Sequence, residues 1–244
     1  MGMGEITRRD ALRTMGLSAG AVAAGAAFGP ALLDDAAFAA DPAAPTLTPD
    51  QAIARLAAGN RRFVKDNLRH PRRDNRRRSA LAEGQTPYAA VLGCADSRVP
   101  PEIIYDEGLG NLFVARIAGN TTDDALVAGS LEYSITVLGS AVIVVLGHEE
   151  CGAVKAAIDV ATKGTVLPGD LPAVVAPILP VVNAAVASGT PADQLLDVVI
   201  KNNVKAAVAA LSDNEALAPL IADGKLKIIG REYLLQSGKA TPVL

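Results

Sequence analysis

Short apolar runs alternate with segments of helical spacing along most of the chain. The runs at 88–93, 111–117, 141–148 and 224–235 predict β-strands. The run AVIVVLGH at 141–148 is continuous and rich in β-branched residues, which is typical of a strand covered on both faces of a parallel sheet. The pattern therefore predicts a largely buried, mostly parallel sheet.

Segments with helical spacing precede and separate these strands. Thr48, Pro49 and Gln51 supply an N-cap, a proline at the first helical position and a capping box for the segment TPDQAIARLAAGNRRFVKDN. Further helices are expected at 123–139, in CGAVKAAIDVATKG and over much of 172–222. Together these elements predict an α/β fold, in which α-helices flank a mostly parallel central β-sheet.

Composition narrows the function classes. The 244 residues are 50% hydrophobic with a net charge of −3, which fits a soluble globular domain rather than a disordered one. Aromatic residues make up only 3% and tryptophan is absent, so a nucleic-acid partner is not expected. Six arginines between Arg69 and Arg78 are interpreted as a solvated or subunit-facing segment, because the chain as a whole is acidic.

The first forty residues have the pattern of an export signal. The segment TRRDALRTMGLSAGAVAAGAAFGPALL contains the pair Arg8–Arg9 and carries no charge from position 15 to 33. Small residues at Ala37 and Ala39 then form a peptidase-type Ala-x-Ala site. The combination predicts a twin-arginine-type signal peptide.

Cleavage after about Ala39 would divide the chain into a signal peptide at 1–39, a linker at 40–47 and a single domain at 48–244. The alternative is an uncleaved membrane anchor, which Pro30 and the alanine- and glycine-rich composition disfavour. The expected mature protein has no stable membrane span and resides in the periplasm, in the cell envelope or outside the cell.

Reactive side chains follow two of the predicted strands. GCADSR follows the first strand, and GHEEC follows the strand at 141–148. Carboxyl ends of parallel strands meet at one edge of a sheet, where active sites gather. Cys94, Asp96 and Arg98 share a face if the chain stays extended there, and His148 lies three residues before Cys151 across a turn.

These residue types suit a metal ion. Cys94, His148 and Cys151 form a Cys₂His set, which tetrahedral zinc accepts while keeping a fourth position open. Asp96 is a candidate fourth ligand; if it pairs with Arg98 instead, the fourth position is left to water. Two alternatives stay open, a Cys94–Cys151 disulfide in an exported protein and a purely structural zinc site.

The motifs resemble those of the β-class carbonic anhydrases. CADSRVPPE and the later HEECGAV match the family's Cys-x-Asp-x-Arg and His-x-x-Cys-Gly patterns, in the same order. GQTPYAAVLGC, NLFVARIAGN and SLEYSITVLG match the segments around them. The resemblance covers about residues 48–235.

The resemblance implies reversible hydration of CO₂ to bicarbonate and a proton by a zinc-bound hydroxide, with one Zn²⁺ per subunit. It assigns Cys94, His148 and Cys151 as ligands, and Asp96 and Arg98 as the gating and catalytic dyad. It also implies a homodimer or homotetramer. The substrate pocket would be lined by Gln85, across the dimer interface, and by Tyr133 and Gly152.

Other functions are compatible with the same motifs. One is hydrolysis of CS₂ or COS at the same zinc site, and another is non-catalytic binding of zinc or bicarbonate. Glu149 stands where the family frequently has serine, so it adds a carboxylate beside His148. Val91 stands where some members carry the tryptophan of a regulatory bicarbonate site, so we do not expect that site here.

Overall fold

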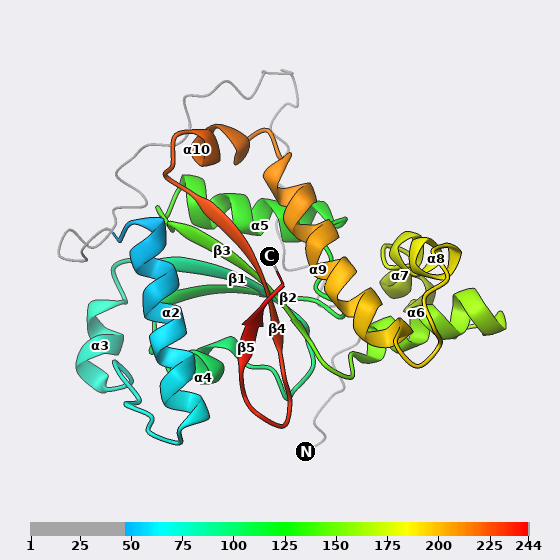
Figure 1. The fold of residues 1–244 in the computed structure, drawn as a ribbon. Coiled ribbons are helices and arrows are strands. Elements are labelled where there is room, and N and C mark those ends of the chain that lie inside the picture. Colours follow the sequence, from blue (N-terminus) through cyan, green and yellow to red (C-terminus); the bar gives the residue numbers. More distant parts are fainter. Residues whose placement is uncertain (1–46, 244) are drawn as a thin grey trace, which may run out of the picture. The chain divides into compact units, whose positions relative to one another are not determined.

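The computed structural model describes residues 47–243 (Figure 1). The predicted signal peptide at 1–39 lies outside the described residues, as does the predicted linker apart from its last residue. Within residues 47–243, no helix combines the length and the apolar character needed to cross a bilayer. The division into signal peptide, linker and domain stays a prediction.

A five-stranded sheet forms the centre of the fold, and it confirms the predicted mostly parallel α/β architecture. The strand order is β2-β1-β3-β4-β5, and only β5 runs antiparallel to its neighbour. The strands are β1 (Ala89–Gly93), β2 (Leu112–Arg116), β3 (Val142–His148), β4 (Lys227–Tyr233) and β5 (Ala240–Pro242). β1 and β3 lie inside the sheet and are buried along their whole length, as expected for strands covered on both faces.

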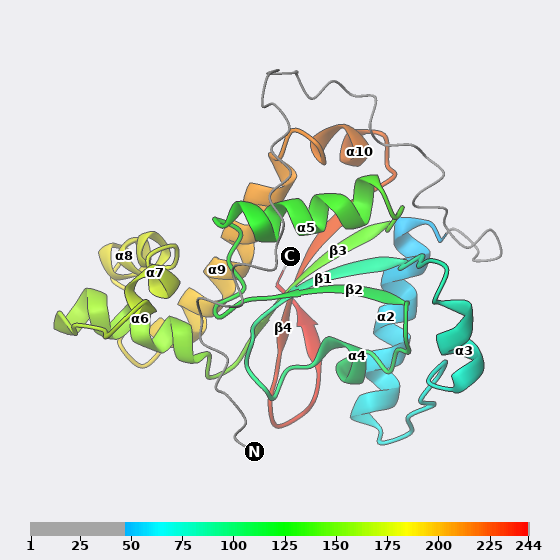
Figure 2. The same cartoon turned by 180° about the vertical axis from the view of Figure 1, so that it is seen from behind.

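Helices cover both faces of the sheet (Figures 1 and 2). On one face, α2 (Pro49–Val64) and α4 (Pro101–Ile104) pack over Val91, Val144 and Leu146. On the other face, α5 (Ala125–Thr136) and α9 (Leu195–Ser212) pack over the alternate residues of the same strands. The remaining described helices are α3 (Asn75–Ala80), α6 (Gly152–Lys163), α7 (Leu171–Val175), α8 (Leu179–Ala187) and α10 (Ala218–Ala222).

α2 starts at the predicted N-cap, Thr48, and an ion pair holds it against the loop after α4. The Thr48 side chain accepts from the Gln51 amide at 3.3 Å, and the Gln51 side chain accepts from the Thr48 amide at 2.9 Å. Further along the helix, Arg55 donates to both oxygens of the buried Glu107 carboxylate at 2.8 and 2.7 Å. A charge buried in this way requires such a partner, so the pair fixes α2 over the loop after α4.

Asn60 joins α2 to the end of the chain. Its buried Nδ2 donates to the carbonyl oxygens of Ile104 at 3.2 Å and Gly238 at 2.8 Å, while its Oδ1 accepts from the Ala240 amide at 3.0 Å. The first helix of the described part and its last strand are thus held by one side chain.

The arginine-rich segment before β1 also has a structural use. The backbone amides of Arg69 and His70 both donate to the Asp106 carboxylate at 3.0 Å, and Arg77 Nε donates to the Leu109 carbonyl at 3.0 Å. The segment therefore braces the loop between α4 and β2, while most of its side chains stay exposed.

Gly59 marks the closest approach of α2 to α4. A Cβ at this position would overlap the carbonyl oxygen of Tyr105. We expect Gly59→Ala to lower the free energy of unfolding by about 2 kcal/mol, even though alanine favours a helix over glycine by about 1 kcal/mol. Chemical denaturation measures the change.

Gly129→Ala in α5 is the matched control, because no atom in the described part of its own chain lies within 4 Å of a Cβ there. It should raise stability through helix propensity alone. A Gly59→Ala protein as stable as the Gly129→Ala protein would contradict this account of the contact.

Candidate metal centre

The sheet brings the two predicted clusters to one edge. Cys94 directly follows β1, and His148 is the last residue of the neighbouring strand β3. The register pairs Gly93 with Leu146, so Cys94 lies almost level with His148. Cys151 is the N-cap of α6, at the end of the short turn after β3.

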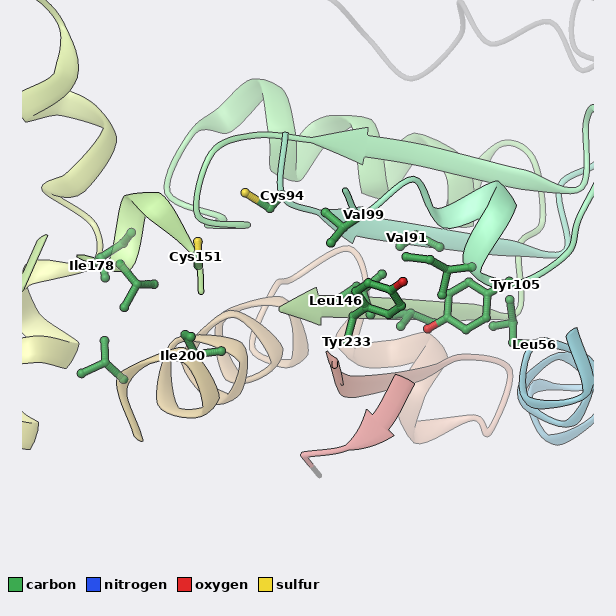
Figure 3. Packing of buried hydrophobic residues seen from close by; sticks show 14 of the residues in the cluster. Leu56, Val91, Cys94, Val99, Tyr105, Leu146, Cys151, Ile178, Ile200 and Tyr233 are labelled. Atoms are coloured by element: carbon green, nitrogen blue, oxygen red, sulfur yellow. The ribbon is translucent and has the colours of Figure 1, made fainter. Parts of the chain in front are cut away.

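Cys94, His148 and Cys151 bring three ligand atoms together, all within 4.8 Å of one another. The three residues are almost completely buried, at 4%, 1% and 1% exposure. Both cysteines are free thiols, so the structure does not contain the disulfide that the sequence left open. Figure 3 shows the two sulfur atoms near the start of α6, between Ile178 and Val99 in this view.

The histidine ring has one nitrogen used and one nitrogen free. Nδ1 lies 2.8 Å from the Glu149 carbonyl oxygen, so it carries the proton and donates. Nε2 then holds a lone pair, and it is buried without a hydrogen-bond partner among the described residues. An orphaned buried acceptor is costly unless a ligand occupies it, and a neutral imidazole beside two thiols is a zinc donor set. The residues therefore fit the metal.

The surroundings of Cys94 favour its thiolate. The Cys151 thiol, followed by His148 and the Gly119 amide, lowers the pKa of Cys94 to about 4. The Gly119 amide donates to the Cys94 sulfur at 3.4 Å, and Asn203 on α9 fixes Gly119 by donating to its carbonyl at 2.8 Å. A thiolate is the form that ligates a metal, so this environment prepares the site.

Asp96 faces Arg98. Arg98 donates from Nε to Oδ1 at 2.9 Å and from Nη2 to Oδ2 at 2.7 Å, a bidentate ion pair. The Arg98 guanidinium holds the pKa of Asp96 well below its usual range. The Asp96 carboxylate pairs with Arg98 and is not among the ligand atoms that lie together.

Two positioning residues carry no strong signal in the sequence. Arg116, at the end of β2, donates from Nε to the Cys94 carbonyl at 2.8 Å and from Nη2 to the Asp96 carbonyl. It therefore fixes the loop that presents both side chains. Asn203 is a buried polar residue on an otherwise apolar helix face, and that break in the pattern is the signal that could have found it.

The structure separates the predicted pocket residues. Gly152 begins α6 and lies next to Cys151. Gln85 is exposed in the loop before β1, at the far end of that strand from Cys94. Tyr133 lies on α5 against Phe113 near the start of β2, with ring centroids 6.2 Å apart. Neither Gln85 nor Tyr133 joins the metal centre of its own chain.

Glu149 is engaged away from the ligand atoms. Its carboxylate accepts from the Leu235 amide at 2.7 Å, in the segment after β4. Its own amide donates to the Tyr233 carbonyl at 3.1 Å. The extra carboxylate beside His148 therefore joins the turn after β3 to the end of β4.

Comparisons with known proteins show which family the chain resembles. A sequence model of the family described as Carbonic anhydrase matches residues 89–240. "Carbonic anhydrase 2" of Mycobacterium tuberculosis is 42% identical over 197 residues, which cover 80% of this chain and 93% of that protein.

Solved structures of similar fold carry related descriptions. A β-carbonic anhydrase from Coccomyxa, in complex with acetazolamide, is 30% identical with a TM-score of 0.61, over 67% of this chain and 75% of that one. One of two tetrameric β-carbonic anhydrases from Sordaria macrospora is 25% identical with a TM-score of 0.62, over 67% of this chain and 84% of that one.

Cys94→Ser removes one of the two thiol ligands. We expect zinc affinity to fall by about 100-fold or more, because even changes outside the ligand set cost up to about that much. Metal content after dialysis against a chelator measures the loss.

His70→Asn is the control, because His70 is exposed in the segment before β1 and is not part of the metal centre. Asparagine tolerates the positive φ of 48° at this position. This variant should keep its zinc. Retention of zinc by Cys94→Ser would show that the metal is held elsewhere.

Proposed function

The chain belongs to the β-class carbonic anhydrases, and we propose that Cys94, His148 and Cys151 hold its catalytic Zn²⁺ while Asp96 and Arg98 position the reacting water. The enzyme is zinc-dependent and hydrates CO₂ reversibly to bicarbonate and a proton. The observation that carries the assignment of residues is the buried Nε2 of His148, which faces two free thiols and has no partner in the described part of the chain.

When bound, the metal lowers the pKa of coordinated water, which supplies a nucleophile near neutral pH. The chain's own residues orient that water. Asp96, kept ionised by Arg98, would accept a hydrogen bond from that water and thereby orient its lone pair toward CO₂. Arg98 also donates to the Glu150 carbonyl at 3.4 Å, which anchors the pair to the turn that carries Cys151.

The intact Asp96–Arg98 pair argues against a non-catalytic zinc-binding protein, because pure binding does not need it. Hydrolysis of CS₂ or COS requires the same centre, and no residue described here favours it over CO₂ hydration. Turnover of CO₂ and CS₂ by one zinc-loaded preparation separates the two, and activity on CS₂ alone would assign the centre to that chemistry.

We also propose that the enzyme is a homodimer or homotetramer in which Gln85 and Tyr133 reach the metal centre of the partner subunit. Both residues lie toward the far end of the sheet from their own centre. The β2 edge and α5 beside them are only half-buried, and the Sordaria macrospora relative is described as tetrameric. Light scattering tests this, and a monomer with full activity would contradict it.

Asp96→Asn keeps the size of the side chain and removes its charge. We expect kcat/KM for CO₂ hydration to fall by roughly 100-fold while zinc content stays unchanged, because the amide no longer pairs with Arg98 in the same way. Stopped-flow measurements and metal analysis provide the two readouts. Asp213→Asn, on the exposed end of α9, is the control, and wild-type turnover by Asp96→Asn would remove Asp96 from the mechanism.

For the amino-terminal segment, we propose export by the twin-arginine route to the periplasm, the cell envelope or the exterior. The support is the Arg8–Arg9 pair, the uncharged stretch after it and the Ala37-x-Ala39 site. Replacing both arginines with lysine should leave the uncleaved protein inside the cell. Unchanged export of that variant, measured by fractionation and amino-terminal sequencing, would contradict the route.

A further inference from the structure

A cavity of about 170 Å³ lies between α2 and the sheet, away from the metal centre. Its walls are mostly apolar and come from Ile53, Leu56, Ala57, Val144, Ile229 and Pro242. Val144 precedes His148 by four residues on β3, about 13 Å along the strand. The cavity therefore lies on the same face of the sheet as His148 but is lined by a different set of residues.

Tyr105 supplies an unused donor to this cavity. The residue follows α4, lies beside Leu56 in Figure 3 and is only 3% exposed. Its hydroxyl has no hydrogen-bond partner among the described residues. Burial raises the pKa of Tyr105, so the hydroxyl keeps its proton. Since buried polar groups are nearly always paired, this donor points to a ligand.

Arg231, which is half-buried, adds a positive charge to the lining. It alternates with Ile229 and Tyr233 on β4, so its side chain lies on the face covered by α2. Its guanidinium forms no hydrogen bond or ion pair with residues 47–243, and its only interaction there is electrostatic, with Tyr105. By contrast, Arg55 on the same side of the sheet has a carboxylate partner.

The other described residues of the lining offer these two donors no acceptor. None of them carries a carboxylate, and the third polar one, Asn60, is already bonded to Ile104, Gly238 and Ala240. The cavity thus combines two donors, the Arg231 guanidinium and the Tyr105 hydroxyl, with walls that are otherwise mostly apolar.

We propose that this cavity binds a small aliphatic carboxylate, with its carboxylate group between Arg231 and Tyr105 and its alkyl chain against Leu56, Val144 and Ile229. A guanidinium matches a carboxylate geometrically, and the hydroxyl adds a second kind of donor. The volume corresponds to about five or six waters, which suits an acid of about two to four carbons. Bicarbonate fits less well, because the apolar walls leave its third oxygen unpaired.

Titration calorimetry of the zinc-loaded enzyme with propionate tests the proposal. Arg231→Gln should weaken binding by about tenfold or more, because a charged hydrogen bond is lost. Tyr105→Phe should weaken binding severalfold and yet raise the Tm of the ligand-free protein, because it removes an unpaired buried hydroxyl. A merely structural tyrosine would not give that combination. Arg61→Gln, an exposed arginine on α2, is the control.

Crystals of the zinc enzyme soaked in propionate should show the acid between Arg231 and Tyr105. Several outcomes would overturn the proposal: density at the metal centre alone, ordered water alone in the cavity, or propionate binding that Arg231→Gln and Tyr105→Phe leave unchanged. Bicarbonate bound as tightly as propionate would overturn the aliphatic preference. These readouts do not depend on CO₂ turnover, so they stand or fall separately from the proposed function.

Discussion

The parallel pairing of β1 with β3 is the constraint on which the centre depends. It places the residue after one strand and the last residue of the other at the same edge, although a strand and two helices separate them in the chain. A shift of one residue in this register would turn His148 toward the opposite face of the sheet. The apolar burial of both strands holds the register, so the core sets the position of the ligands.

Around this edge, side chains that donate to backbone carbonyls hold the loops in place. Arg116 holds the carbonyls of the loop after β1, and Asn203 holds Gly119 from the helix on the other face. The Asp96–Arg98 pair is attached to the same framework through Glu150. Thus contacts from several elements, and not only from the motif segments, determine where the reactive groups lie.

Much of this could be predicted from the sequence, because apolar runs and caps are local signals. The strands, the capping box of α2 and the meeting of the Cys94 and His148 segments follow from them. The placement of Tyr133 against Phe113, away from its own centre, does not follow from local patterns, since it depends on tertiary placement. The same holds for Tyr105 and Arg231, which come from distant segments and carry no shared motif.

The clasp formed by Asn60 has a consequence for biosynthesis. It joins residues 178 and 180 positions apart, so α2 gains these contacts only when the carboxyl-terminal segment is present. A nascent chain that still lacks β5 has the helix without its anchor, and such distant contacts form slowly. The final closure of this domain therefore has to wait until Gly238 and Ala240 have been synthesised.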